Sequence, residues 1–179
     1  MSKVTIVDNV LPENVHKFLY GYMIDEPIWN ISVNSGPTSP EILGRVLYDD
    51  ERNVNSKNGA QALSIFVYMF IKEKVNFLSE RVRRIHLGAK AAMQDDHFHK
   101  DRMDDNSYTV LFYLNPKWKK SWGGHTIVGD EKIEYKPNRA IIYKSNISHK
   151  GIAPKGPSFR TYINYVVDGI FMLVFSLIF

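Results

Sequence analysis

Apolar side chains recur along the chain with two different spacings, one helical and one typical of strands. Between Ala60 and Leu78 they repeat every three or four residues, as in a long amphipathic helix (Leu63, Phe66, Val67, Phe70, Ile71, Val75, Leu78). The stretch Pro12–Tyr22 has the same spacing and predicts a second, shorter helix, with the proline in its first turn. The intervening Ile31–Gly59 is rich in Asn, Ser, Gly, Pro and charge, which indicates long loops with at most a short strand at Arg45–Tyr48.

After Arg81 the pattern changes to short apolar or alternating runs that are separated by turn residues. These runs are Val82–Leu87, Tyr108–Leu114, Thr126–Val128, Lys132–Tyr135, Ala140–Tyr143 and Phe159–Val167. Short strands at such close spacing indicate a β-sandwich or barrel rather than a parallel sheet with crossover helices. We therefore predict one mainly β domain over residues 1–179, in which a helical part over about 1–80 supports a β core over about 81–168.

The sequence ends in an apolar tail over residues 169–179, where Ile170–Phe179 is interrupted only by Ser176. This stretch is too short for a membrane-spanning helix, which needs roughly 20 residues, so no membrane span is expected. We predict that the tail is a last buried strand or helix. A dimer interface or a membrane contact through the tail is the alternative.

The composition narrows the classes of function. The formal charge is +4, but Lys and Arg are scattered rather than gathered into a run, so nucleic acid is not expected as a partner. The chain has no cysteine, so a metal site must use histidine and carboxylate ligands. The first residues lack the charged start and long apolar stretch of a signal peptide, and we therefore expect a cytoplasmic protein.

A short segment after the first predicted β run concentrates residues that can bind a metal. It reads Asp95-Asp96-His97-Phe98-His99-Lys100-Asp101. In an extended strand, His99 and Asp101 point to the same side, and His149 is the candidate for a third ligand from elsewhere in the fold. Two histidines and one carboxylate on one octahedral face leave three positions open, which suits iron(II) oxygen chemistry. His97 is a rival ligand, since it also forms a same-side pair with His99.

The last predicted strand has an unusually polar face. Arg160, Tyr162 and Asn164 alternate along it with mostly apolar residues of the opposite face. An inward arginine needs a partner because an unpaired buried charge is costly, and a bound dicarboxylate would match its planar guanidinium. An ordinary salt bridge or an outward-facing side chain is the alternative. Asn164 and Thr109 complete the candidate set of residues that would bind such a dicarboxylate.

Taken in order, these motifs resemble the prolyl 4-hydroxylase-like branch of the 2-oxoglutarate and iron(II) dioxygenases. The matching elements are His99-Lys-Asp101, the run from Tyr108 to Trp118, Trp122-Gly-Gly-His-Thr126, His149 and Arg160. The resemblance implies a double-stranded β-helix, that is, a cupin-like jelly roll. It also implies iron(II) on the two histidines and the aspartate, 2-oxoglutarate bound by Arg160 and Tyr113, dioxygen as the oxidant, and ascorbate as a candidate cofactor.

The resemblance implies a hydroxylase of an aliphatic C–H bond, with a peptidyl proline as the first substrate class. A free amino acid or another small molecule is the alternative substrate, and a non-catalytic cupin-like binding module is the alternative function. A nucleic-acid demethylase of this superfamily would resemble its relatives in a second arginine at the position of Val166, and a halogenase would lack Asp101. The sequence also departs from the family in two places. The position at which members commonly carry a second cosubstrate-binding tyrosine falls near Ala89, and His125 has no assigned role.

Overall fold

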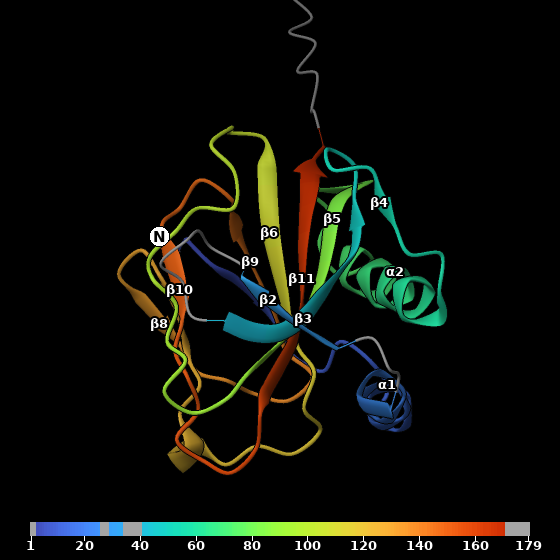
Figure 1. Ribbon diagram of the computed structural model, residues 1–179. Helices are drawn as coiled ribbons and strands as arrows, with labels where there is room; N and C mark the ends of the chain where they lie inside the picture. Colours follow the sequence, from blue (N-terminus) through green and yellow to red (C-terminus); the bar gives the residue numbers. More distant parts are fainter. Residues whose placement is uncertain (1–2, 26–28, 34–40, 171–179) are drawn as a thin grey trace, which may run out of the picture.

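The computed structural model describes residues 3–25, 29–33 and 41–170, with the backbone alone for residues 31–33, 41 and 42. In this part of the chain the strands form two sheets, one of eight strands and one of three, and every strand pair is antiparallel. Both helices lie on the side of the larger sheet that faces away from the smaller one (Figure 1). The predicted mainly β fold with supporting helices is confirmed.

The larger sheet has β11 and β5 at its centre. Its strands, in spatial order, are β1 (Thr5–Val7), β9 (Ala140–Lys144), β6 (Ser107–Tyr113), β11 (Arg160–Gly169), β5 (Leu78–Lys90), β3 (Glu41–Asp49) and β2 (Asn30–Val33), and β4 (Val54–Asn55) pairs with β3. The smaller sheet consists of β10 (His149–Gly151), β7 (Thr126–Val128) and β8 (Glu131–Ile133). A short 3₁₀ helix, Lys120–Trp122, precedes β7.

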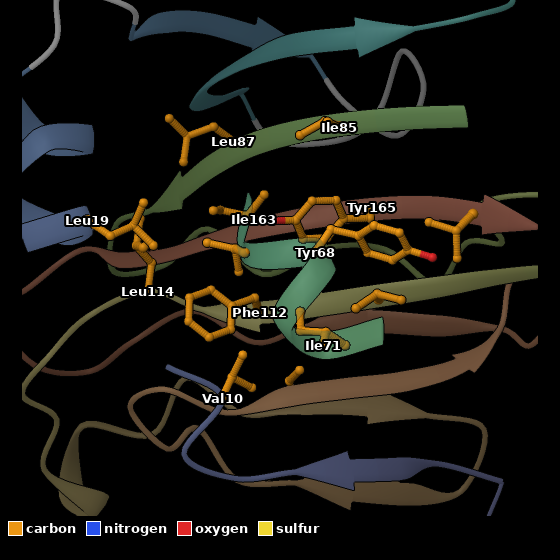
Figure 2. Close-up of a cluster of buried hydrophobic side chains, with 14 of the residues drawn as sticks. Val10, Leu19, Tyr68, Ile71, Ile85, Leu87, Phe112, Leu114, Ile163 and Tyr165 are labelled. Carbon is orange, nitrogen blue, oxygen red and sulfur yellow. The ribbon is translucent and has the colours of Figure 1, made fainter. Parts of the chain in front are cut away.

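The two faces of the larger sheet have different roles because side chains alternate along each strand. On β11, Ile163 and Tyr165 belong to the apolar core against the helices (Figure 2), and Val167 belongs to the same core. The hydroxyl of Tyr165 donates a hydrogen bond of 2.8 Å to the carbonyl of Ser64 and so ties β11 to the helix α2 (Gly59–Lys72). The opposite face of β11 points toward the smaller sheet, where its polar residues are available for a site.

The helices largely follow the predicted pattern. The first, α1, runs from Glu13 to Asp25 directly after Pro12. The second ends at Lys72 rather than at Leu78. Val75 lies between two turns after the helix, and Leu78 is the first residue of β5. Both residues are nevertheless buried in the same core, so they continued the apolar spacing without belonging to the helix.

The prediction of long loops over Ile31–Gly59 is wrong, since β3 and β4 lie in this segment and β2 reaches into it. Gly44 illustrates the reason. Glycine in a sequence suggests a loop, but here a Cβ atom would lie 2.7 Å from the carbonyl oxygen of Leu87 and 2.9 Å from the His86 ring. The glycine allows β3 to approach β5 closely, which only the strand pairing makes visible.

The predicted apolar tail lies almost entirely outside the described residues, which end at Ile170. Its predicted burial and its dimer interface are therefore not addressed by the structure. Among the residues that are described, no helix combines the length and the apolar character that a membrane span needs.

Candidate active site

His99, Asp101 and His149 come together at the edge of the smaller sheet. Each offers a ligand atom, and these atoms lie within 4.8 Å of one another. His149 begins β10, and the backbones of His99 and His149 exchange hydrogen bonds of 3.0 and 2.9 Å. This single bridge brings together residues that are far apart in the sequence.

The segment around Asp101 is not the extended strand that the sequence predicted. Beyond the bridge at His99 the backbone bends, and the N–H of Asp101 donates to the carbonyl of Ser145 at 3.0 Å. Backbone hydrogen bonds to His149 on β10 and to Ser145 after β9, rather than the alternation of side chains along one strand, therefore place His99 and Asp101. His97, the rival ligand, is exposed and lies outside the group of candidate ligands.

Hydrogen bonds to the backbone orient both imidazole rings. Nδ1 of His99 lies 3.0 Å from the carbonyl of His97, and Nδ1 of His149 lies 3.0 Å from that of Ile147. A carbonyl only accepts, so each Nδ1 carries the proton when the ring is neutral, and Nε2 keeps a lone pair for a metal. Burial, followed by the charge of His149, lowers the pKa of His99 and favours its neutral, ligating form.

Asp101 is held in its charged form by several neighbours. One carboxylate oxygen accepts a hydrogen bond from Nη2 of Arg84, and the other accepts one from the Thr109 hydroxyl at 2.8 Å. Burial by itself raises the pKa of Asp101, but the hydrogen bond from His149 and the charge of Arg84 outweigh it, and the pKa lies well below its usual range. In the metal-free protein His149 is the counter-charge, and its pKa is raised because the pairing with Asp101 exceeds the opposing effect of burial.

A cavity of about 290 Å³ opens beside the three candidate ligands. Its walls come mainly from the inner face of the larger sheet and from the segment 96–101, with a smaller part from β10. The lining residues are Val46, Arg52, Arg84, His86, Asp96, His99, Lys100, Asp101, Leu111, Thr126, Tyr143, His149, Gly151, Arg160, Tyr162 and Asn164.

Arg160 is a buried cation without a carboxylate partner in the described part of the chain. Only 1% of the residue is exposed. Its Nε donates to the carbonyl of Gly124 and its Nη2 to the hydroxyl of Thr126, both at 2.7 Å. Arg160 therefore forms no ordinary salt bridge with the described residues. The carbonyl and the hydroxyl that it contacts are neutral and leave its positive charge uncompensated. A carboxylate bound in the cavity fits this side chain.

The other predicted cosubstrate residues occupy different places. Asn164 lines the cavity, and its Oδ1 is buried without a hydrogen-bond partner in the described structure. Tyr113 is buried behind the wall, where its hydroxyl lies 2.8 Å from that of Thr126. Thr109 contacts Asp101, as described above. Among the three, only Asn164 faces the cavity directly.

Sequence reasoning missed the polar residues of β5. Arg84 and His86 line the cavity, and Lys90, which is fully buried, forms an ion pair with Asp96. Lys90 lies opposite Arg160 in the register of β5 and β11, next to the position where the sequence lacked a cosubstrate tyrosine. The signal was the alternation of Arg84 and His86 within the predicted strand Val82–Leu87, which resembles the polar face recognised on β11. Lys90 lies beyond the predicted strand, and β5 extends to it in the structure.

Comparison with known proteins identifies a family that part of the chain resembles. Residues 81–166 match the model of the 2OG-Fe(II) oxygenase superfamily. No curated protein sequence matches the chain significantly.

Several solved structures share the fold at low sequence identity. A Pseudomonas putida prolyl-4-hydroxylase has a TM-score of 0.64 and 13% identity, over 93% of this chain and 92% of that one. A Trichoplax adhaerens prolyl hydroxylase, in complex with a hypoxia inducible factor peptide fragment, has a TM-score of 0.64 and 17% identity, over 93% and 83%. HygX from Streptomyces hygroscopicus, with nickel and 2-oxoglutarate bound, has a TM-score of 0.68 and 8% identity, over 95% and 84%. The predicted jelly-roll fold is confirmed by these similarities.

Proposed function

Residues 81–166 match the 2OG-Fe(II) oxygenase superfamily, and from this premise we propose that the chain is such an oxygenase and that it hydroxylates an aliphatic C–H bond. One atom of dioxygen would enter the substrate, and the other would enter succinate as 2-oxoglutarate loses carbon dioxide. The observation that carries the proposal is the grouping of His99, Asp101 and His149 next to the uncompensated charge of Arg160.

The residues present fit an iron(II) ion. Two imidazoles and a carboxylate form the donor set, and their surroundings favour a neutral His99 ring and a charged Asp101. His99, Asp101 and His149 would hold the ion, which would supply the activation of dioxygen that protein side chains cannot provide. The contacts of Thr109 and Arg84 to Asp101 fix the direction of the carboxylate.

Arg160 would bind the distal carboxylate of 2-oxoglutarate. The hydrogen bonds to Gly124 and Thr126 hold the guanidinium in place before the cosubstrate arrives, so little side-chain entropy is lost on binding. Tyr113 would act through its contact with Thr126 and would so position Arg160 from behind the wall. Asn164 remains a candidate for a direct contact in the cavity.

The substrate class has two candidates. A peptidyl proline is supported by the sequence resemblance and by the similarity to prolyl hydroxylases, one of which is in complex with a peptide fragment. A small molecule, such as a free amino acid, is favoured by the modest cavity and by its charged lining.

Succinate formation tests the proposed function. The purified protein would be supplied with iron(II), ascorbate and 2-oxoglutarate, and screened against proline-rich peptides and free amino acids. We expect succinate production that requires iron(II), that increases with the substrate, and that accompanies the gain of one oxygen atom by the substrate in mass spectrometry. A metal-loaded protein that neither binds nor consumes 2-oxoglutarate would refute the proposal and would favour a binding module.

A further inference from the structure

Arg84 is the charged residue of β5 that points into the cavity. Its neighbour Arg83 points to the other side of the strand, where Nε lies 2.6 Å from a carboxylate oxygen of Asp168. Arg84 instead lines the cavity with Asp101 and His149, and its side chain is 28% exposed. A group bound next to the metal ligands would therefore lie within reach of this guanidinium.

The guanidinium of Arg84 is only partly satisfied by the protein. Nη2 contacts Asp101, but Nε is buried and has no hydrogen-bond partner among the described residues. The Oδ1 atom of Asn164, on the neighbouring strand β11, is also buried without a hydrogen-bond partner among the described residues. Both Arg84 and Asn164 line the cavity. Unpaired polar atoms at a cavity wall are where a ligand gains most from hydrogen bonding.

The charges of the loaded site leave Arg84 without a counter-ion. A divalent ion would be balanced by Asp101 and one carboxylate of 2-oxoglutarate, and the other carboxylate would balance Arg160. Lys90 is already paired with Asp96. Burial, followed by the charge of Arg84, lowers the pKa of His86 to about 3, so this side chain is neutral and adds no charge.

Two further cations add to the excess of positive charge in the cavity. Arg52 and Lys100 also line the cavity, and both are exposed residues. Arg52 lies 3.7 Å from Asp49, which compensates it in part. Positive charge therefore extends from the candidate ligands to the surface, an arrangement that attracts an anion.

From this geometry we infer that the substrate carries a carboxylate and that Arg84 binds it. The inference rests on the proposed function and names the substrate class: a free amino acid or a similarly small organic acid. The guanidinium keeps its Nη2 contact to Asp101, and Nε, which has no partner among the described residues, would donate to the substrate carboxylate. Arg84 is thus a specificity-determining residue of the same site.

The test compares acids with their uncharged analogues. The protein, loaded with nickel(II) and 2-oxoglutarate to prevent turnover, is titrated calorimetrically with the standard free L-amino acids and with their primary amides. We expect at least one acid to bind about tenfold or more tightly than its amide, because the amide lacks the charge that pairs with the guanidinium, and tenfold corresponds to about 1.4 kcal/mol. Equal binding of every acid and its amide, or no binding of any acid, would overturn the inference.

Variants separate recognition of the carboxylate from support of Asp101. Arg84→Gln should abolish the preference for acid over amide, and Arg84→Lys should retain part of it because the charge is kept. A merely structural role would weaken metal binding and both ligands together but would leave their ratio unchanged. Arg81→Gln is the matched control, because this exposed arginine of the same strand lies outside the cavity.

A peptide arm distinguishes the source of the carboxylate. Proline-containing peptides with free and with amidated C-termini are titrated under the same conditions. Tight binding of an internal prolyl peptide that has no carboxylate, unaffected by Arg84→Gln, would overturn the inference in favour of a peptide substrate. Calorimetric binding of 2-oxoglutarate to the nickel-loaded protein is measured separately, so its failure would instead point to the proposed function.

Discussion

Asp101 has unusually many contacts for a carboxylate that could bind a metal. Arg84 and Thr109 occupy its two oxygens, its backbone is fixed to Ser145, and His149 lies 3.5 Å away. Each contact restricts the direction in which the acid can point. Such restriction favours a preformed site, in which little reorganisation is needed when an ion binds.

Removing this carboxylate tests the site directly. We expect Asp101→Ala to abolish stable binding of iron(II) and the consumption of 2-oxoglutarate, because two histidines alone leave the ion without its charged ligand. Metal content after dialysis and succinate formation provide the measurements. His97→Ala is the matched control and should behave as the wild type, since His97 is exposed and outside the ligand group. If His97→Ala lost the metal and Asp101→Ala kept it, the assignment would be wrong.

Arg160 allows a second prediction for a single residue. Arg160→Ala should weaken 2-oxoglutarate binding by about 2–5 kcal/mol, the usual effect of losing one side of a buried charge pair. Calorimetric titration of 2-oxoglutarate into the metal-loaded protein gives the affinity. Arg160→Lys should be intermediate, because it retains the charge without the planar fork. Wild-type affinity in the alanine variant would contradict the role assigned to Arg160.

At the scale of elements, β11 joins the core to the site. Its apolar face packs against α2, while its other face presents Arg160, Tyr162 and Asn164 to the cavity. The helix supports the strand, and the strand supports the site. Because α2 lies on the face of β11 opposite the cavity, it stabilises the fold but contributes none of the described residues that line the cavity.

The start of α2 offers a test of this separation. Asn58 is its N-cap, and the side-chain oxygen accepts a hydrogen bond of 3.0 Å from the backbone N–H of Gln61. Asn58→Ala should lower the free energy of unfolding by about 1 kcal/mol, as measured by urea denaturation. Asn58→Ser should restore most of the loss, because serine also caps helices. Neither change should alter 2-oxoglutarate affinity, and a large change in affinity would contradict the separation.

At the scale of the whole molecule, the inner face of the sheet makes the metal-free fold sensitive to acid. His86 is buried there, and its pKa is lowered from 6.5 to about 3 by burial and by Arg84. A lowered pKa means that the unfolded chain binds the proton more readily than the folded one. The resulting stability is fully present above pH 6.5 and is lost as the pH falls toward 3.

Replacing His86 should remove this contribution. Between pH 6 and pH 4, the wild type should lose up to about 1.4 kcal/mol of unfolding free energy per pH unit through His86, and His86→Gln should show a correspondingly smaller slope. Urea denaturation of the metal-free proteins at several pH values measures both slopes. His97→Gln serves as the control for an exposed histidine. Equal slopes in the wild type and in His86→Gln would show that His86 does not carry the effect.

The sequence by itself determined the features that depend on near neighbours along the chain. Alternation predicted most strands after residue 81, helical spacing predicted α1 and α2, and the polar face of β11 singled out Arg160. The ordered motifs also pointed to the candidate ligands before any geometry was known. These features follow from the regular spacing at which side chains return to the same face of a strand or helix, and this spacing can be recognised in the sequence alone.

Tertiary structure alone decided which distant segments meet. The pairing of β3 with β5 accommodates Gly44, the bridge between His99 and His149 assembles the candidate ligands, and the register of β5 turns Arg84 toward Asp101. A charge such as Arg84 looks like an ordinary surface residue until the strands beside it are placed. Its environment depends on long-range packing, because burial and charge compensation belong to the assembled cavity and not to any one stretch of sequence.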